Sequence, residues 1–135
     1  MNGTGCMSEP LEREWRFYVE DMVGFCSKVL SYTQDLDASS FAGSGIHYDA
    51  TLRNIELVGE AATHIPEKIR RAHPEIAWRK IIATRNRLIH GYLGIDNDVL
   101  WSIVQSDIPQ LLEQLRILQS QGETSRLQPT GSSNT

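Results

Sequence analysis

Apolar side chains recur every three or four residues from Glu9 to Thr33, and this spacing constrains the fold more than any other feature of the chain. An α-helix gathers side chains at such intervals on one face, which must then pack against other elements. The apolar positions are Leu11, Trp15, Tyr18, Val19, Met22, Cys26, Val29 and Leu30. We therefore predict one long amphipathic helix over 9–33.

Two more main helices and a short one are expected in the middle of the chain. A second helix extends from about Tyr48 to His64, a short helix covers 66–73, and a third main helix covers 75–89. Pro66 and Pro74 each suit the first position of a helix, where the missing N–H is not needed. The inward side chains of the two main helices are Leu52, Ile55, Val58, Gly59, Ala62, Ile65, Trp78, Ile81, Ile82, Leu88 and Ile89.

A final main helix is predicted from Asp96, as its N-cap, to about Ser120. Pro109 lies within this helix and removes one backbone hydrogen bond, so we expect a kink near Gln105 rather than two helices. The apolar face consists of Leu100, Val104, Ile108, Leu111, Leu115 and Leu118.

The remaining segments lack helical spacing. Segment 35–49 is rich in Ser, Gly and Asp, which favour turns, so we predict a loop anchored by Phe41. Residues 1–8 are expected to be flexible, and 121–135, which have little apolar content, to be disordered. No segment shows the alternation of a strand. The sequence thus predicts one all-α domain over 9–120, an up-and-down bundle of four main helices plus a short helix.

Composition restricts the class of protein. A chain of 135 residues is long enough for one compact domain, and its 40% apolar and 22% charged residues are typical of globular proteins. No apolar stretch is long enough to cross a membrane, and the N-terminus lacks a secretory signal pattern, so we expect a cytoplasmic protein. Cys6 and Cys26 form no C-x-x-C pair, which argues against a zinc site or a disulfide.

The net charge of −4 conceals opposite charges in two parts of the chain. Residues 1–60 carry ten acidic against four basic side chains, whereas residues 67–90 carry seven Lys and Arg against two Glu. Phosphate attraction depends on local potential within about 8 to 10 Å at physiological salt, so the basic segment can attract a polyanion. A solvated helix face would have the same composition, and charge alone does not separate the two interpretations.

Arg85 lies in the middle of the apolar face of the third main helix, where a permanent charge needs compensation. A carboxylate of the core, a bound anion or a water-lined groove could supply it. Glu60 is the candidate carboxylate because Gly59, beside it, suggests that another helix packs very close there. The sequence leaves open whether Arg85 belongs to a buried ion pair or to an anion site.

His90 and Tyr92 follow Arg85 in the stretch RNRLIHGY. On an ideal helix His90 would lie about 140° away from Arg85. Gly91, however, predicts that the helix ends near His90 in a left-handed turn, which would let the three side chains converge on a groove. A histidine that only interacts with the helix dipole is the simpler alternative.

Arginine, histidine and tyrosine together suit the cleavage of a phosphodiester without a metal ion. Arg85 can stabilise the negative charge of the transition state, and His90 can take a proton from a ribose 2′-OH or give one to the leaving oxygen. Asn86 and Arg87 could contact neighbouring phosphates. Because one histidine cannot be a free base and a free acid at once, we expect a two-fold homodimer that brings two motifs to one groove.

The stretch RNRLIHGY (85–92), with NIELVGEA (54–61) and GIDNDVLW (94–101), resembles the HepT toxins of the HEPN superfamily. The resemblance implies an all-α homodimer that acts as a metal-independent endoribonuclease on transfer RNA or messenger RNA, with Arg85 and His90 as catalytic residues. It also implies that a nucleotidyltransferase antitoxin, MntA, neutralises the toxin by transferring AMP from ATP to Tyr92. The toxin itself would need no cofactor.

Two other functions fit the same residues. A non-catalytic helical subunit of a nucleotidyltransferase complex could present Arg85 and Tyr92 to a nucleotide or to its partner. A structural helical dimer without nucleotide chemistry is also compatible with the sequence. A His90 that approaches the dimer axis in each subunit and is open to solvent would favour catalysis, whereas a His90 hydrogen-bonded inside the core would favour the binding subunit.

Overall fold

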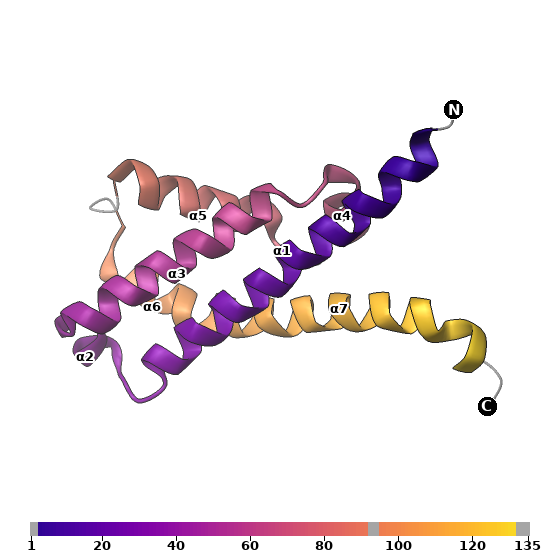
Figure 1. Ribbon diagram of the computed structural model, residues 1–135. Helices are drawn as coiled ribbons and strands as arrows, with labels where there is room; N and C mark the ends of the chain where they lie inside the picture. The colour runs from indigo at the N-terminus through magenta and orange to yellow at the C-terminus, as the bar shows by residue number, and fades with distance from the viewer. Residues whose placement is uncertain (1–2, 92–94, 132–135) are drawn as a thin grey trace.

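The computed structural model describes the backbone of residues 3–91 and 95–131 and the side chains of residues 13–91 and 95–121. All regular structure in these ranges is helical, without a strand (Figure 1), and the predicted all-α fold is confirmed. In chain order the elements are α1 (Gly3–Thr33), α2 (Ala38–Gly43), α3 (Gly45–Thr63), α4 (Glu67–Ala72), α5 (Trp78–Gly91), α6 (Asn97–Ser102), the π-helical segment η2 (Ile103–Asp107) and α7 (Ile108–Gly131).

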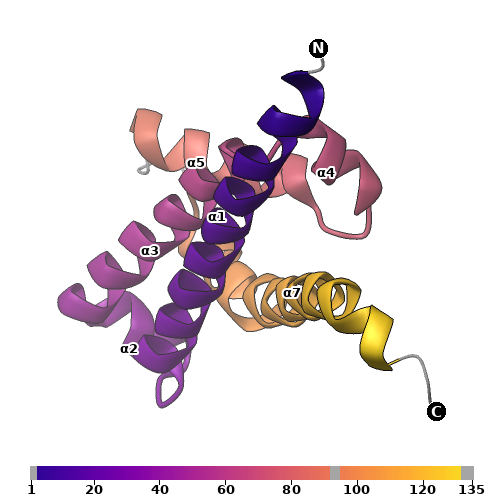
Figure 2. The ribbon, with the colours of Figure 1, turned by 45° about the vertical axis from the view of Figure 1, so that its right-hand side comes forward.

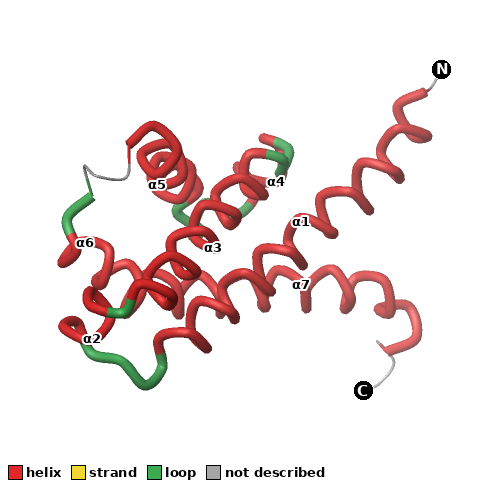
Figure 3. Tube along the Cα trace, turned by 60° about the vertical axis from the view of Figure 1, so that its left-hand side comes forward, coloured by secondary structure: helices red, strands yellow, loops and turns green. Residues whose placement is uncertain are grey.

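Helix α3 lies between α1 and α5, and α1 also packs on α7 (Figures 1 and 2). The start of α1 and the end of α7 extend beyond the bundle on the same side (Figure 3). In the part of the chain that is described, no helix is long and apolar enough to cross a membrane.

The core contains the apolar faces that the spacing predicted. Phe41 is fully buried, as expected, and packs on Tyr48 and Trp101. Burial raises the pKa of the Cys26 thiol to about 12, because the charged thiolate has no water around it. The buried side chains of α1, α6, η2 and α7 include Trp15, Val19, Met22, Cys26, Val29, Leu100, Val104, Ile108, Leu111, Leu115 and Leu118.

The predicted loop over 35–49 is wrong, because this segment contains α2 and the start of α3. Asp37 caps α2 by accepting a hydrogen bond from the Ser40 N–H (2.8 Å), and the Ser40 hydroxyl accepts one from the Asp37 N–H (2.9 Å). This reciprocal capping box satisfies backbone donors that a short helix leaves open. The Asp-x-x-Ser pattern was present in the sequence, but a helix of six residues has no apolar period to reveal it.

Helix α5 begins at Trp78 and not at Glu75, as the sequence predicted. The indole N–H of Trp78 donates to the carbonyl of His73 (3.0 Å), which holds the intervening residues in a turn. Ile89, predicted as a core residue, is 45% exposed, whereas its neighbour Leu88 is buried. The apolar face of α5 therefore ends one residue earlier than the pattern suggested.

Pro109 lies just after an irregular turn of the last helix, near the position where a kink was predicted. The helical backbone continues from α6 to α7, but it passes through η2, where the N–H of Ile108 bonds the carbonyl of Ile103, five residues earlier. Because Pro109 has no N–H, the carbonyl of Gln105 loses its usual partner, and the wider π turn absorbs the irregularity at the expected position.

The outer helices are longer than predicted. Helix α1 starts at Gly3 and α7 continues to Gly131, so the backbone is helical in parts of the segments expected to be flexible or disordered. A helix needs only its own backbone hydrogen bonds, whereas the predicted bounds followed apolar side chains that pack on a core. Domain boundaries at residues 9 and 120 stay a prediction.

Gly59 marks the predicted close approach between helices. A Cβ added at Gly59 would lie 2.1 Å from Cβ of Arg85 and 3.1 Å from the carbonyl oxygen of Ile81. Both obstacles are close to the backbone of α5 and cannot rotate away. Helix α3 therefore needs glycine at this point.

We predict that Gly59→Ala lowers the free energy of unfolding by at least about 1 to 3 kcal/mol, because α5 must move away from α3. Gly24→Ala in α1 is the matched control: its Cβ would meet nothing within 4 Å, so the better helix propensity of alanine should raise stability by about 0.5 to 1 kcal/mol. Urea unfolding of both variants measures the two effects. Equal behaviour of the two variants would contradict the close approach.

Candidate active site at the junction of α3 and α5

Arg85 and Glu60 form an ion pair between α5 and α3, through Nη2 of Arg85 and Oε1 of Glu60. The Cβ and Cγ of Arg85 lie against Gly59, which fixes the base of the side chain. The pairing with Glu60 is the one that the sequence suggested. The pair is not buried in the core, however, because the Arg85 side chain is 25% exposed and that of Glu60 45%.

The second oxygen of Glu60 contacts a histidine that the sequence did not point to. His64 Nε2 lies 3.3 Å from Glu60 Oε2, and the two residues are four apart, at the end of α3. The imidazole ring of His64 stacks on Tyr18 of α1, with ring centroids 4.6 Å apart and an angle of 11° between the planes. The sequence signal for this contact was a Glu followed four residues later by a His on a predicted helix.

The Glu60 carboxylate stays ionised to lower pH than usual. Its pKa is lowered by the hydrogen bond that it accepts from His64, by the hydrogen bond from Arg85 and by the positive charge of Arg85. Since the pKa in the folded state is depressed, these contacts persist at neutral pH and are lost only as the pH falls through the folded value.

Asn86 holds the guanidinium of Arg85 along α5. Arg85 Nη1 donates to Oδ1 of Asn86 (2.8 Å), while Nε of Arg85 is buried without a hydrogen-bond partner among the described residues. Solvent therefore reaches the guanidinium along its Nη1 and Nη2 edge. Asn86 and His90 are four residues apart, so they share one face of α5 with their Cβ atoms about 5 to 6 Å apart.

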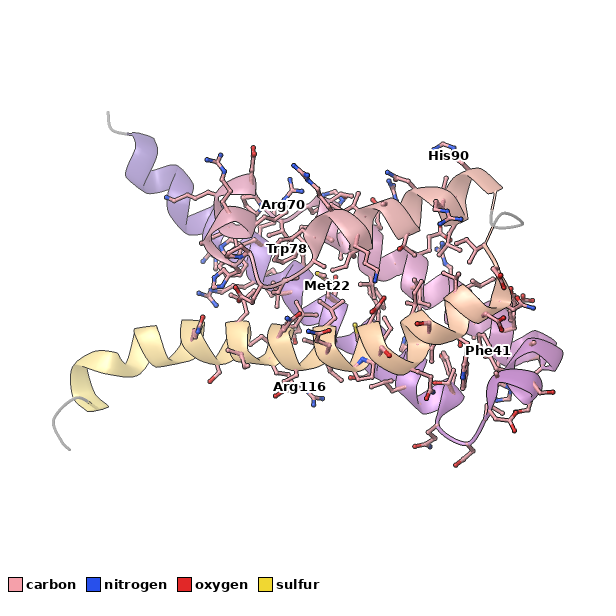
Figure 4. The ribbon with its side chains drawn as sticks, turned by 180° about the vertical axis from the view of Figure 1, so that it is seen from behind. Met22, Phe41, Arg70, Trp78, His90 and Arg116 are labelled. Atoms are coloured by element: carbon pink, nitrogen blue, oxygen red, sulfur yellow. The ribbon has the colours of Figure 1, made fainter. Side chains whose placement is uncertain are left out.

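His90 lies in the last turn of α5 and is exposed, projecting away from the bundle (Figure 4). Helix α5 ends at Gly91, whose φ of +155° is a backbone conformation that side chains with a Cβ rarely adopt. The predicted glycine termination after His90 is confirmed. Tyr92, the third member of the motif, lies outside the described residues.

Arg87 does not join Arg85, although both belong to the motif. Two residues along an α-helix correspond to a rotation of about 200°, so Arg87 points to the other side of α5. There it lines a cleft of about 430 Å³ between α5 and α6, together with Lys80, Asp98 and Val99. Arg85 and Arg87 therefore face different sides of α5 in one subunit, and a contact of Arg87 with a neighbouring phosphate stays a prediction.

Several bases of segment 67–90 already have acidic partners. Arg71 pairs with Glu67 (3.7 Å) and Lys80 with Asp107 (2.9 Å), in addition to the pair of Arg85. These contacts reduce the charge available to a polyanion. Among the side chains that are described, no three His, Cys, Asp or Glu residues gather as a group that could hold a metal ion.

An all-α bundle with an arginine and a histidine on its penultimate long helix agrees with the HEPN-type fold that the resemblance implied. A model of the family described as HepT-like, Ribonuclease HepT-like, matches residues 22–118, and the chain belongs to this family. No solved structure matches the chain.

Curated relatives agree with the family. The chain is 31% identical over 107 residues to "Putative RNase MJ1380" of Methanocaldococcus jannaschii, a match that covers 79% of this chain and 98% of the relative. It is 36% identical over 101 residues to "Probable ribonuclease HepT" of Thermococcus cleftensis, covering 75% of this chain and 92% of the relative. A third relative, "Putative RNase TTE0752" of Caldanaerobacter subterraneus, is 28% identical over 107 residues, with 78% and 96% coverage.

We predict that the pKa of Glu60, followed by NMR of its carboxyl carbon, lies below the usual range of a glutamate and rises in Arg85→Met and in His64→Phe. Each change removes one of the contacts that stabilise the carboxylate. Asp37 is an internal control, because its pKa is lowered by the capping hydrogen bonds of Ser40 and should not respond to either variant. A Glu60 pKa that is the same in all three proteins would contradict the network.

Proposed function

We propose that this protein is a metal-independent endoribonuclease and the toxin of a toxin–antitoxin pair. The observation that carries the proposal is the position of Arg85, whose guanidinium Asn86 turns toward the face of α5 on which His90 is exposed. The names of the relatives, which describe ribonucleases, support the choice of RNA as substrate.

In this reaction a ribose 2′-oxygen attacks the adjacent phosphorus and the 5′-oxygen of the next nucleotide leaves. His90 accepts the proton of the 2′-OH or donates a proton to the leaving oxygen. The open Nη edge of Arg85 donates hydrogen bonds to the phosphoryl oxygens as their negative charge grows. Glu60 and Asn86 hold the guanidinium in place, and the products are a 2′,3′-cyclic phosphate and a 5′-hydroxyl.

The open position of His90 favours catalysis over the non-catalytic binding subunit. A proton-transfer group must reach the substrate, whereas a histidine of purely structural role would be held in the core. His90 is exposed at the end of α5, where its neighbour Ile89 is also exposed.

A homodimer completes the proposed mechanism. One subunit offers one His90, and a second copy related by a two-fold axis would supply the histidine of opposite role. The exposed apolar side chains Ile89 and Val99, on α5 and α6, lie where a second copy could cover them. The basic residues of α5 from both subunits would then face the same RNA.

Regulation would act through Tyr92, two residues after His90 in the chain. We propose that a nucleotidyltransferase antitoxin of the MntA type transfers AMP from ATP to the Tyr92 hydroxyl and releases pyrophosphate. The added phosphate is negative and bulky, so it would repel RNA and obstruct the approach to Arg85. The toxin, its partner and its transfer RNA or messenger RNA substrate would meet in the cytoplasm.

We predict that the purified protein cleaves RNA in the presence of EDTA and leaves cyclic phosphate ends. His90→Ala should lower the cleavage rate by about 10² to 10⁴ because the proton-transfer group is lost. His47→Ala, a change of an exposed histidine in the first turn of α3, is the matched control and should cleave like the wild type. Cleavage that depends strictly on added magnesium would rule out the mechanism.

We predict that incubation with ATP and the cognate nucleotidyltransferase adds one adenylate to the protein and stops RNA cleavage. Intact-mass analysis measures the increment. Tyr92→Phe lacks the acceptor hydroxyl, so it should stay unmodified and remain active in the same mixture. An adenylate that also forms on Tyr92→Phe would place the modification on another residue.

A further inference from the structure

His64 presents a flat aromatic ring to solvent beside the candidate active site. Tyr18 covers one face of the imidazole, and the His64 side chain is nonetheless 46% exposed. The exposed part of the ring therefore comprises its edge and the face turned away from Tyr18. No role in RNA cleavage requires this histidine, because His90 transfers the proton in the proposed mechanism.

Two contacts hold the His64 ring in one orientation. Tyr18 stacks against its inner face, and Nε2 of the ring hydrogen-bonds with the Glu60 carboxylate. A side chain fixed in this way loses little conformational entropy when a ligand packs on it. The flat ring of His64 is thus already held in one orientation and does not rotate freely.

The ring lies next to the group that would bind phosphate. One oxygen of the Glu60 carboxylate contacts His64 and the other contacts Arg85, so a single carboxylate separates the imidazole from the guanidinium. In a nucleotide, likewise, a single ribose separates the base from its phosphate. A nucleotide whose phosphate lies on Arg85 can therefore place its base over His64.

Basic residues follow His64 in the chain. Helix α4 follows after Ile65 and Pro66, and it carries Lys68, Arg70 and Arg71. Arg71 has a long contact of 3.7 Å with Glu67, in an exposed position where such a pair is weak. Arg85, His64 and the bases of α4 thus supply positive charge and an aromatic ring, which single-stranded RNA sites combine.

We propose that the His64 ring, backed by Tyr18, is a stacking platform for a nucleobase of the RNA whose phosphate Arg85 binds. The proposal rests on the proposed ribonuclease function and adds a base subsite to it. The ligand is an unpaired base, since a base inside a duplex has no free face. Stacking of this kind tolerates different bases, so the platform selects single-stranded RNA rather than one sequence.

The competing explanation is that His64 only positions Glu60 and, through it, Arg85. Two substitutions separate the explanations. His64→Phe keeps an aromatic ring on Tyr18 but cannot hydrogen-bond Glu60, whereas His64→Gln can still reach Glu60 but has no ring. A platform needs the ring, and a positioning residue needs the hydrogen bond.

The test measures RNA binding in a His90→Ala background, so that the RNA stays intact. The probe is a short single-stranded oligouridylate that contains one 2-aminopurine, whose fluorescence falls when it stacks on an aromatic ring. We expect quenching by the His64 protein and by His64→Phe. His64→Gln should lose the quenching and bind about 5-fold to 100-fold more weakly, the usual range for loss of one stacked base.

His47→Gln is the matched control, an exposed histidine at the opposite end of α3, and it should bind like the parent protein. Normal binding by His64→Gln, or loss of quenching in His64→Phe, would overturn the platform. Cleavage by the wild type is measured in parallel. Quenching without cleavage would support the stacking platform and reject the ribonuclease function. Cleavage without quenching would support the ribonuclease function and reject the platform.

Discussion

The close approach of α3 and α5 at Gly59 is the constraint on which the candidate site depends. Only a hydrogen atom fits where the Cβ of Arg85 presses against α3. Because Glu60 is the next residue, the same contact that packs the two helices brings the guanidinium within reach of its carboxylate. Packing and placement of the charged group are therefore one feature of the fold, and a larger residue at position 59 would disturb both.

The Glu60 carboxylate contacts both Arg85 and His64. One oxygen contacts Arg85 and the other contacts His64, and Asn86 accepts a hydrogen bond from Nη1 of Arg85. Exposed ion pairs contribute little to stability, since water screens them and long side chains lose entropy. The contacts of Glu60 and Asn86 are better understood as fixing the orientation of Arg85 and His64 toward solvent. In that view the arginine and histidine of the motif act beside a second imidazole ring, that of His64 at the end of α3.

Sequence reasoning succeeded where elements are long. The apolar periods of α1 and α7 repeat over several turns, so local exceptions do not hide them, and Pro109 marked the irregular turn at η2. It failed for α2, because one turn and a half has no period and only the Asp37 capping box defines it. The start of α5 was missed for another reason: the His73 carbonyl and the Trp78 indole N–H set it through a contact that no spacing encodes.

The amino-acid sequence by itself determined the all-α class, the inward faces of the main helices and the close packing at Gly59, and it offered Glu60 as one candidate partner of Arg85. Each follows from local periodicity or from a single residue whose chemistry demands a partner. Only the tertiary structure decided that His64 shares the Glu60 carboxylate and stacks on Tyr18, and that Arg87 lines a cleft between α5 and α6. Periodicity reports which side of a helix is buried, whereas the rotation and distance between helices depend on all packed side chains at once.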